Sequence, residues 1–224
     1  HDTGPPPVRG GLIGNVTPNG ESFVGINSIG QATPGAATDV AIGKVTIGGR
    51  VEFTRILAGY DDSSPPLGVN ADAQIGPVRV GGDWVASSIV AGAVNLGADG
   101  APGGIGMNAD NRVFGDMNDA KIDEMAATGQ PDSATISSRI ASITIAGQIF
   151  GTPLSFSDTD RFGFVAEQIG ALKIGGATIA LQVGSNNDGI ILGPNGDMTA
   201  HEIGALIGST VQFVNSPTLV NETT

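Results

Sequence analysis

One octet recurs along the chain, and this recurrence constrains the fold more than any other feature. The pattern is a leading Ile-Gly step, two alternating apolar residues and a closing pair of small residues. The copies are IGKVTIGG (42–49), IGPVRVGG (75–82), IASITIAG (140–147, with Ala in place of the first Gly), IGALKIGG (169–176), the looser IGNVTPNG (13–20) and the shortened IGALIGS (203–209). The spacing of the leading isoleucines gives a period of about 32 residues, with one double step between Ile75 and Ile140. Periods of this length are typical of proteins built by stacking repeated units.

Each octet is predicted to form a short strand between glycine corners. Val45 and Ile47 fall on one face, and Lys44 and Thr46 fall on the other, which is the alternation of a half-buried strand. The residues after the Gly pair also align, because RVEFTRILAG (50–59) matches DWVASSIVAG (83–92). Each unit is therefore predicted to contain a strand, a Gly corner, a strand, a Gly-Gly corner, a third strand and a variable loop.

The predicted fold is all-β, a parallel β-helix or β-solenoid of about six to seven coils with roughly 30 residues each. Inward Ile, Val and Leu residues are expected to stack on their equivalents in the coils above and below, which gives a continuous core without aromatic residues. Gly supplies 36 of the 224 residues, about twice its usual share, and this suits frequent corners. The alternative is an antiparallel β-sandwich of short strands, which also favours Gly-rich turns but has no reason to keep a fixed period.

The pattern divides the chain into three parts. An N-terminal arm is expected at 1–11, a single β-solenoid domain at 12–215 and a C-terminal tail at 216–224. Within the solenoid domain, residues 97–132 depart from the repeat and form an acidic insertion. The arm and the tail are expected to cover the ends of the stack or to reach into a neighbouring subunit.

The acidic insertion is the candidate metal site. It holds seven acidic residues against two basic ones, and its segment GDMNDAKIDEMAATG (115–129) is predicted to form a short helix with Asp116 or Asn118 as N-cap. Carboxylate and amide oxygens next to glycines are what Ca²⁺ requires, and the residues assigned to a candidate calcium site are Asp99, Asp116, Asn118 and Asp119. The spacing does not match an EF-hand loop, so a solvated acidic insertion is the competing interpretation.

Charge and composition exclude several classes of function. The 22 acidic residues outnumber the 10 basic ones, for a net charge of −12, which argues against binding of nucleic acid. No run of 18 apolar residues exists, so we predict no membrane insertion. The absence of Cys excludes a disulfide scaffold and a thiolate metal site.

No catalytic or cofactor-binding residues emerge from the motifs. The octet lacks the Lys of a phosphate loop. His1 and His201 could together bind copper, but the side chain of His201 is expected to face solvent or to cap the stack. Paired acids for polysaccharide hydrolysis could be drawn from Asp158, Asp160, Glu167 and Asp188, although any acidic chain offers such pairs. We therefore predict that the protein is not an enzyme.

Three segments carry a resemblance to known proteins. At GGDWVASSIVAGAVNLGADG (81–100), RIASITIAGQIFGT (139–152) and DRFGFVAEQIGALKIGG (160–176), the chain resembles the β-strand repeat regions of very large secreted or cell-surface bacterial proteins. The resemblance implies an extracellular, adhesin-like β-solenoid, and it brings no catalytic residues.

The function expected from these observations is structural. We predict a secreted subunit for cell-surface, matrix or filament assembly that self-associates end to end, because uncovered solenoid ends expose unpaired backbone groups. A cell-surface polysaccharide is a further candidate partner. The alternative is a carbohydrate-binding or polysaccharide-cleaving β-helix protein.

Overall fold

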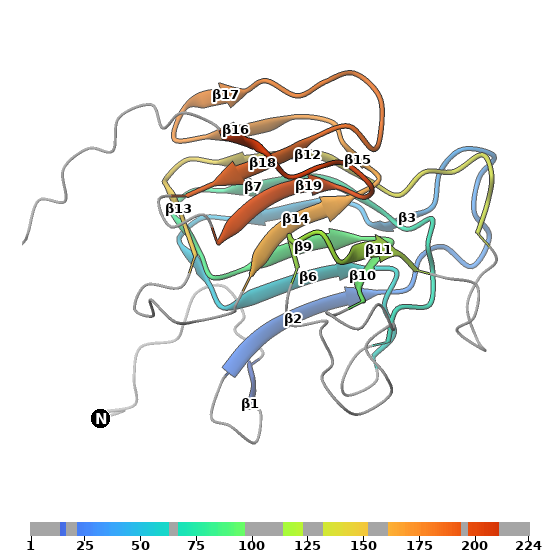
Figure 1. Cartoon of the computed structure of the whole chain (residues 1–224). Coiled ribbons are helices and arrows are strands. Elements are labelled where there is room, and N and C mark those ends of the chain that lie inside the picture. Colours follow the sequence, from blue (N-terminus) through green and yellow to red (C-terminus); the bar gives the residue numbers. More distant parts are fainter. Residues whose placement is uncertain are drawn as a thin grey trace, which may run out of the picture.

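The chain winds into a β-solenoid of about four turns (Figure 1). The computed structural model describes residues 14–16, 22–62, 67–96, 114–122, 132–151, 161–193 and 197–210. Within these ranges the regular elements are strands, and none is helical. Most of the pairing between successive turns is parallel, so the sandwich alternative is wrong and the all-β solenoid is confirmed.

One sheet, which we call the octet sheet, is built from the repeated octets. Its parallel strands are β3 (Val40–Ile42) with β4 (Val45–Ile47), β7 (Gln74–Val80), β12 (Arg139–Ile145), and β15 (Gln168–Ile169) with β16 (Leu172–Ile174). The leading isoleucines form one ladder, in which Ile75 lies opposite Ile42 and Ile140, and Ile140 lies opposite Ile169. The alignment predicted from the sequence is therefore confirmed for these four octets. The antiparallel strand β17 (Ala177–Ile179) follows β16.

Two further sheets complete each turn. The corner sheet consists of β5 (Val51–Glu52), β8 (Trp84–Val85) and β13 (Ile149–Phe150). The return sheet has the parallel strands β2 (Ser22–Ser28), β6 (Thr54–Ala58), β9 (Ser88–Ala91), β14 (Phe162–Ala166) and β19 (Met198–Glu202). At its edges lie β1 (Gly14–Val16), antiparallel to β2, and β18 (Gly189–Leu192), antiparallel to β19 and parallel to β20 (Ser209–Thr210).

The predicted number of coils, six to seven, is wrong for three local reasons. At the start of the chain, β1 pairs with β2 in the return sheet, so this part of the loose first copy adds no rung to the octet sheet. At the other end, the copy that begins at Ile203 follows β19, and its Leu206 side chain is 82% exposed. That copy lacks one residue, which places its apolar residues on opposite faces. In the middle, β7 pairs directly with β12, so the insertion contributes no turn.

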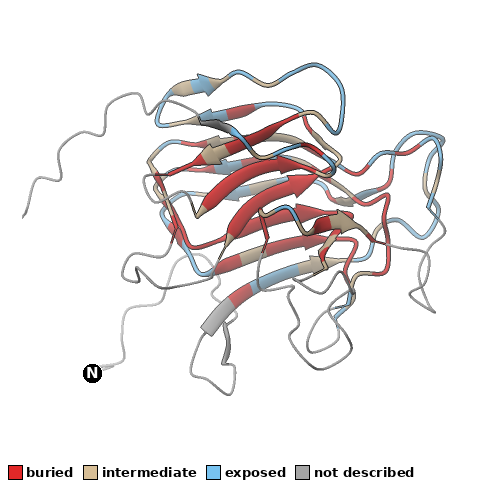
Figure 2. Cartoon of the chain, viewed as in Figure 1, coloured by how far each residue is buried: buried red, intermediate tan, exposed pale blue. Residues whose placement is uncertain are grey.

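The core lies inside the three sheets (Figure 2). Aliphatic side chains of the octets fill most of it, as predicted, with Ile75, Val78 and Ile143 almost completely buried. The expectation of a core without aromatic residues is wrong. Trp84 is fully buried and meets Phe164 edge to face, with ring centroids 5.7 Å apart. Trp84 comes from β8 of the corner sheet and Phe164 from β14 of the return sheet, so the two rings join these sheets inside the core.

A second apolar cluster lies on the outer face of the return sheet. It contains Leu57, Tyr60, Val90, Phe114 and Val165, among others. The covering element comes from the insertion, where β10 (Ala93–Asn95) pairs antiparallel with β11 (Asp119–Lys121). The Tyr60 hydroxyl donates a hydrogen bond of 2.5 Å to the Ala93 carbonyl, and burial raises the pKa of Tyr60. The described part of the insertion is thus packed on the solenoid through this second apolar cluster.

Candidate functional site

The described part of the acidic insertion forms a turn and a strand. Residues 115–118 make the turn that leads into β11, so the predicted helix with Asp116 or Asn118 as N-cap is wrong for residues 115–122. Backbone pairing of β11 with β10 and burial of Ile122 outweigh the local helix signal. The rest of the predicted helix and Asp99 lie outside the described residues.

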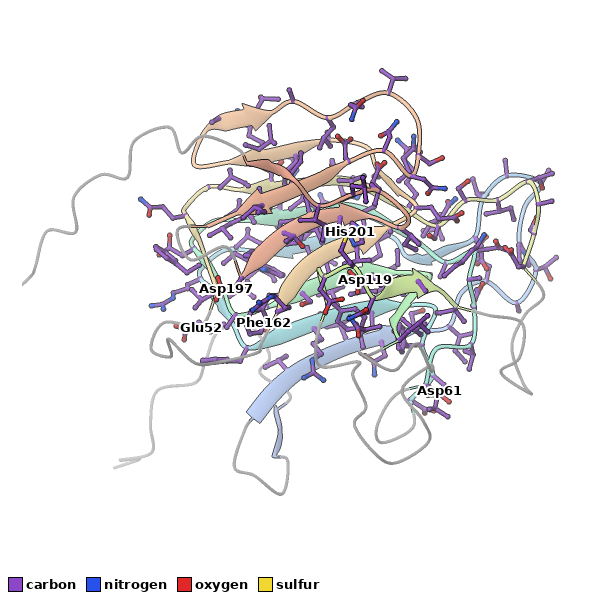
Figure 3. All side chains as sticks on the ribbon, in the orientation of Figure 1. Glu52, Asp61, Asp119, Phe162, Asp197 and His201 are labelled. Atoms are coloured by element: carbon purple, nitrogen blue, oxygen red, sulfur yellow. The ribbon has the colours of Figure 1, made fainter. Side chains whose placement is uncertain are left out.

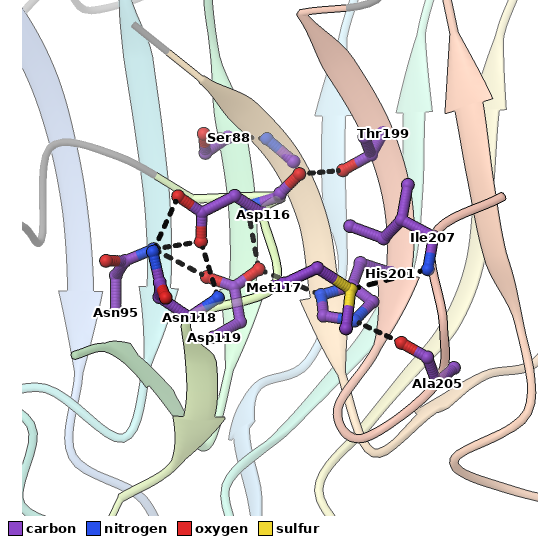
Figure 4. Close-up of polar contacts among 12 residues, drawn as sticks. Ser88, Asn95, Asp116, Met117, Asn118, Asp119, Thr199, His201, Ala205 and Ile207 are labelled. Carbon is purple, nitrogen blue, oxygen red and sulfur yellow. Dashed lines mark hydrogen bonds and ion pairs between the residues drawn. The ribbon is translucent and has the colours of Figure 1, made fainter. Parts of the chain in front are cut away.

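Three of the four candidate calcium ligands lie together in this turn (Figure 4). Oδ1 of Asp116 accepts hydrogen bonds from Nδ2 of Asn95 at 2.7 Å and from the backbone amide of Asn118 at 2.8 Å. The same Asn95 amide group donates to Oδ1 of Asp119 at 3.3 Å. Both carboxylates therefore face one shared donor, and Asn95 is a member of the site that sequence reasoning missed.

Asp119 forms a buried pair with His201 from β19 (Figure 3). Oδ2 of Asp119 lies 3.0 Å from Nδ1 of His201 and also accepts a hydrogen bond of 2.8 Å from the Gly115 amide. Nε2 of His201 lies 3.0 Å from the carbonyl oxygen of Ala205. Because a carbonyl only accepts, Nε2 carries a proton, and a proton on Nδ1 as well makes the pair imidazolium and carboxylate.

The charge of this pair follows from its surroundings. Burial by itself lowers the pKa of His201, but the hydrogen bond and negative charge of Asp119 raise it by more. His201 is 1% exposed, so the expectation that it faces solvent or caps the stack is wrong. The repeat pattern does not predict this burial. His201 lies inside β19, and the described part of the insertion covers its side chain.

The Asp-His pair is arranged for structure rather than for catalysis. A Ser-His-Asp site needs a hydroxyl hydrogen-bonded to the free imidazole nitrogen, and here Ala205 occupies that nitrogen. The nearby Thr199 hydroxyl donates to the Gly115 carbonyl at 2.8 Å. These bonds join the insertion to β19, so they fix the insertion on the return sheet.

A second polar group lies where the return sheet leads into the octet sheet. We call it the acidic corner; its members are Asp39, Asp72, Glu167 and Glu202, with Asn70 and Ser138. Oε2 of Glu167 accepts a hydrogen bond of 2.8 Å from the Ser138 amide of the preceding turn. In the same way, Oε1 of Glu202 accepts one of 2.8 Å from the Ile169 amide. The carboxylates thus satisfy buried backbone donors between turns.

Glu202 accepts more backbone hydrogen bonds than its bond to Ile169. Its Oε2 accepts two further backbone hydrogen bonds, from Asn187 at 2.9 Å and from Asp188 at 3.3 Å. Burial raises the pKa of Glu202, and the backbone hydrogen bonds oppose that rise without cancelling it. The recurrence of an acid one to three residues before the Ile-Gly step, at Asp39, Asp72, Glu167 and Glu202, is the sequence signal that could have identified this corner.

Lys121 links the insertion to the acidic corner. Its Nζ lies 2.6 Å from Oδ1 of Asp132 and 3.2 Å from Oε2 of Glu167. Burial lowers the pKa of Lys121, but the hydrogen bonds and charges of Asp132 and Glu167 outweigh it and raise the pKa. Asp72 faces the same group, and burial raises its pKa to about 6. Its Oδ1 is buried without a hydrogen-bond partner.

The remaining sequence candidates do not gather into a site. Among the acids considered for hydrolysis, Glu167 and Asp188 accept backbone hydrogen bonds, and Asp158 and Asp160 lie outside the described ranges, as does His1. Within the described ranges no three His, Cys, Asp or Glu residues are grouped so that they could hold a metal ion. The calcium site therefore stays a prediction.

Comparisons with known protein families, with curated proteins and with solved structures gave no match to this chain. In the part of the chain that the structure covers, no helix is long and apolar enough to cross a membrane.

Proposed function

We propose that this chain is a structural β-solenoid subunit of a secreted cell-surface, matrix or filament assembly, and that subunits associate end to end. The observation that carries the proposal is an unfinished turn at the lower end in Figure 1. There, β2 and the antiparallel strand β1 extend the return sheet beyond the first full turn. Among the described residues, neither the octet sheet nor the corner sheet has a strand below β3, β4 and β5.

The glycines of the lowest octet support this proposal. A Cβ on Gly76 would overlap the carbonyl oxygen of Gly43 in the turn below, and one on Gly81 would overlap that of Gly48. At Gly76 and Gly81 the strand beneath thus requires glycine, whereas the next octet carries Ala141 and Ala146 at the equivalent positions. A Cβ on Gly43 or Gly48 meets no described atom within 4 Å. The lowest octet therefore keeps glycines that suit a further strand beneath it.

Exposed apolar side chains gather at both ends of the solenoid. Among the exposed large apolar side chains of the described part, four lie in or beside the lowest strands, namely Ile26, Ile29, Val40 and Phe53. Two lie near the upper end, Val183 after β17 and Leu206 after β19. The two ends of the octet sheet differ, because β17 at the upper end is antiparallel to its neighbour, whereas β3 and β4 at the lower end belong to the parallel set. Contact between unlike ends of identical subunits does not close on itself and extends into a filament.

A mixing experiment tests the proposed contact. Gly43→Glu is designed to block the lower end, and Val183→Asp with Leu206→Asp the upper end. A Cβ on Gly43 meets no described atom within 4 Å, and the Val183 and Leu206 side chains are exposed. Wild-type protein is expected to form linear assemblies at high concentration, seen by electron microscopy and light scattering. Each blocked variant alone is expected to remain monomeric, and an equimolar mixture of the two is expected to give dimers.

Other outcomes exclude this arrangement. If wild-type protein remains monomeric at millimolar concentration, end-to-end association is wrong. If the upper-end variant alone forms dimers, the contact joins two lower ends and is closed. Circular dichroism melting of both variants serves as the control for folding.

A further inference from the structure

The outer face of the octet sheet is positively charged in a strongly acidic chain. The segments that form its four parallel turns, 40–47, 74–80, 139–145 and 168–174, contain four basic residues and no Asp or Glu. The whole chain has 22 acidic and 10 basic residues, so this face gathers a large share of the positive charge. Its basic residues, Lys44, Arg79, Arg139 and Lys173, are all exposed.

Each turn of the solenoid contributes one of these bases. Pairing places Arg79 opposite Thr144, and Thr144 opposite Lys173, so the two cations share a column and stand two strands apart. At the spacing of parallel strands this separation is about 9.6 Å along the stack. Lys44 lies one turn below Arg79, and Arg139 begins the strand between the turns of Arg79 and Lys173. Lys44 is offset from the column of Arg79 and Lys173 by two residues, and Arg139, which lies opposite Gln74 and Gln168, is offset by five. The four charges therefore spread across the outer face of the octet sheet.

These four charges are not neutralised within the part of the molecule that is described. The ion pairs found there join Arg50 to Glu52, Lys121 to Asp132 and Glu167, and His201 to Asp119. None of them includes a base of the octet sheet. A group of unpaired positive charges on one face attracts a partner of negative charge.

The other side chains on this face select the class of partner. Thr46, Thr144 and Thr178 follow the same column, and Gln74 and Gln168 flank Arg139, so hydroxyl and amide groups surround the charges. The segments of the octet sheet contain no aromatic residue on which nucleic-acid bases could stack. Its outward side chains include no Leu, Phe or Trp that could enter a bilayer. A polymer that carries both carboxylates and hydroxyls fits this composition.

We propose that the outer face of the octet sheet binds a linear acidic polysaccharide, with its carboxylates on Lys44, Arg79, Arg139 and Lys173. The polymer lies along the column of Arg79 and Lys173, and Lys44 and Arg139 bind carboxylates on the N-terminal side of that column. Arg79 and Arg139 bind carboxylates through paired N–H donors, and the Thr hydroxyls hydrogen-bond the sugar hydroxyls. This binding uses a face of the solenoid and does not require its ends to associate.

Binding to polygalacturonate, a linear polyuronate, tests the proposal. In biolayer interferometry, the full-length protein is expected to bind polygalacturonate but not neutral dextran. Its affinity for polygalacturonate is expected to fall by about tenfold or more when the NaCl concentration is raised from 50 to 200 mM. Arg79→Gln is expected to weaken binding several-fold, and Arg79→Gln with Lys173→Gln about tenfold or more. Arg50→Gln is the matched control, because Arg50 is an exposed arginine whose charge is already paired with Glu52.

Several results would overturn the proposal. These are no binding of wild-type protein to polygalacturonate, equal losses for Arg79→Gln and Arg50→Gln, or tighter binding to duplex DNA or phosphatidylserine vesicles than to the polyuronate. The upper-end variant, Val183→Asp with Leu206→Asp, has its substitutions outside the octet strands and separates this proposal from end-to-end association. It is expected to bind polygalacturonate as a monomer, so failure of one proposal leaves the other testable.

Discussion

Gly76 and Gly43 hold the same place in successive octets but meet different surroundings. A Cβ on Gly76 overlaps the Gly43 carbonyl oxygen, which belongs to backbone that cannot move without breaking the ladder. Gly43 itself borders open space. Gly76→Ala is therefore expected to lower the free energy of unfolding by about 1–3 kcal/mol, as for an overpacked core. Gly43→Ala is expected to change it by less than about 0.5 kcal/mol.

Urea unfolding of the two variants, followed by circular dichroism, measures this difference. A similar loss in both would show that helical or strand propensity, rather than the strand beneath, sets the cost. No change in Gly76→Ala would mean that the turns are farther apart than the backbone pairing indicates.

Asp72 gives the acidic corner a dependence on pH. Burial raises its pKa from 3.8 to about 6, so the folded chain holds a proton on this carboxyl at pH values where the unfolded chain has released it. The stabilising contribution is complete below about pH 4 and is lost as the pH rises through about 6. Asp72→Asn removes the titrating group and is expected to remove this part of the pH dependence.

Melting temperatures of wild type and Asp72→Asn, measured between pH 4 and pH 8, test the assignment. The wild type is expected to lose stability relative to the variant between about pH 4 and 6, and the difference is expected to stay constant at higher pH. Asp62→Asn serves as the control, because Asp62 is exposed. A difference that grows in the opposite direction would mean that the folded state favours the charged carboxylate.

At the scale of elements, the hairpin of β10 and β11 shows how pairing decides a local structure. Residues 116–122 carry a helix signal in the sequence, yet Asp119–Lys121 pairs with Ala93–Asn95 and the adjacent side chains become buried. The hairpin is then held by the Asp119–His201 pair at one point and by Lys121 at another. The predicted calcium site belongs to this element.

Calcium binding is expected to stabilise the hairpin and with it the whole domain. At a calcium concentration one hundred times the Kd, binding only to the folded state adds about 2.7 kcal/mol to the free energy of unfolding. Differential scanning calorimetry with calcium and with EDTA measures this increase, and Asp116→Asn is expected to abolish it. Asp62→Asn is the matched control. Equal melting temperatures with calcium and EDTA would contradict the calcium site.

At the scale of the whole molecule, the solenoid offers separate surfaces for the two proposed interactions. The ends offer open backbone and apolar side chains, whereas the octet sheet offers a flat basic face along the axis. Stacked subunits would continue that basic face from one copy to the next, which would raise the avidity for a long polymer. The mixing experiment and the polyuronate experiment therefore address separate surfaces of one molecule.

The sequence by itself determined the repeated architecture. Alternation of Val45 and Ile47 with polar neighbours, and glycines at the corners, fixed which residues face the core, and the register of the isoleucine ladder followed from their spacing. These signals are local and recur in four turns, so pattern reasoning detects them.

Only the tertiary structure decided where the repeat stops and how the insertion packs. Whether IGNVTPNG and IGALIGS become rungs depends on neighbours that compete for their backbone, and both ends of the return sheet adopt antiparallel strands instead. The burial of His201 against Asp119, 82 residues away in sequence, likewise leaves no local pattern. Contacts between distant segments set these features, and their free energies exceed the local preferences that a sequence displays.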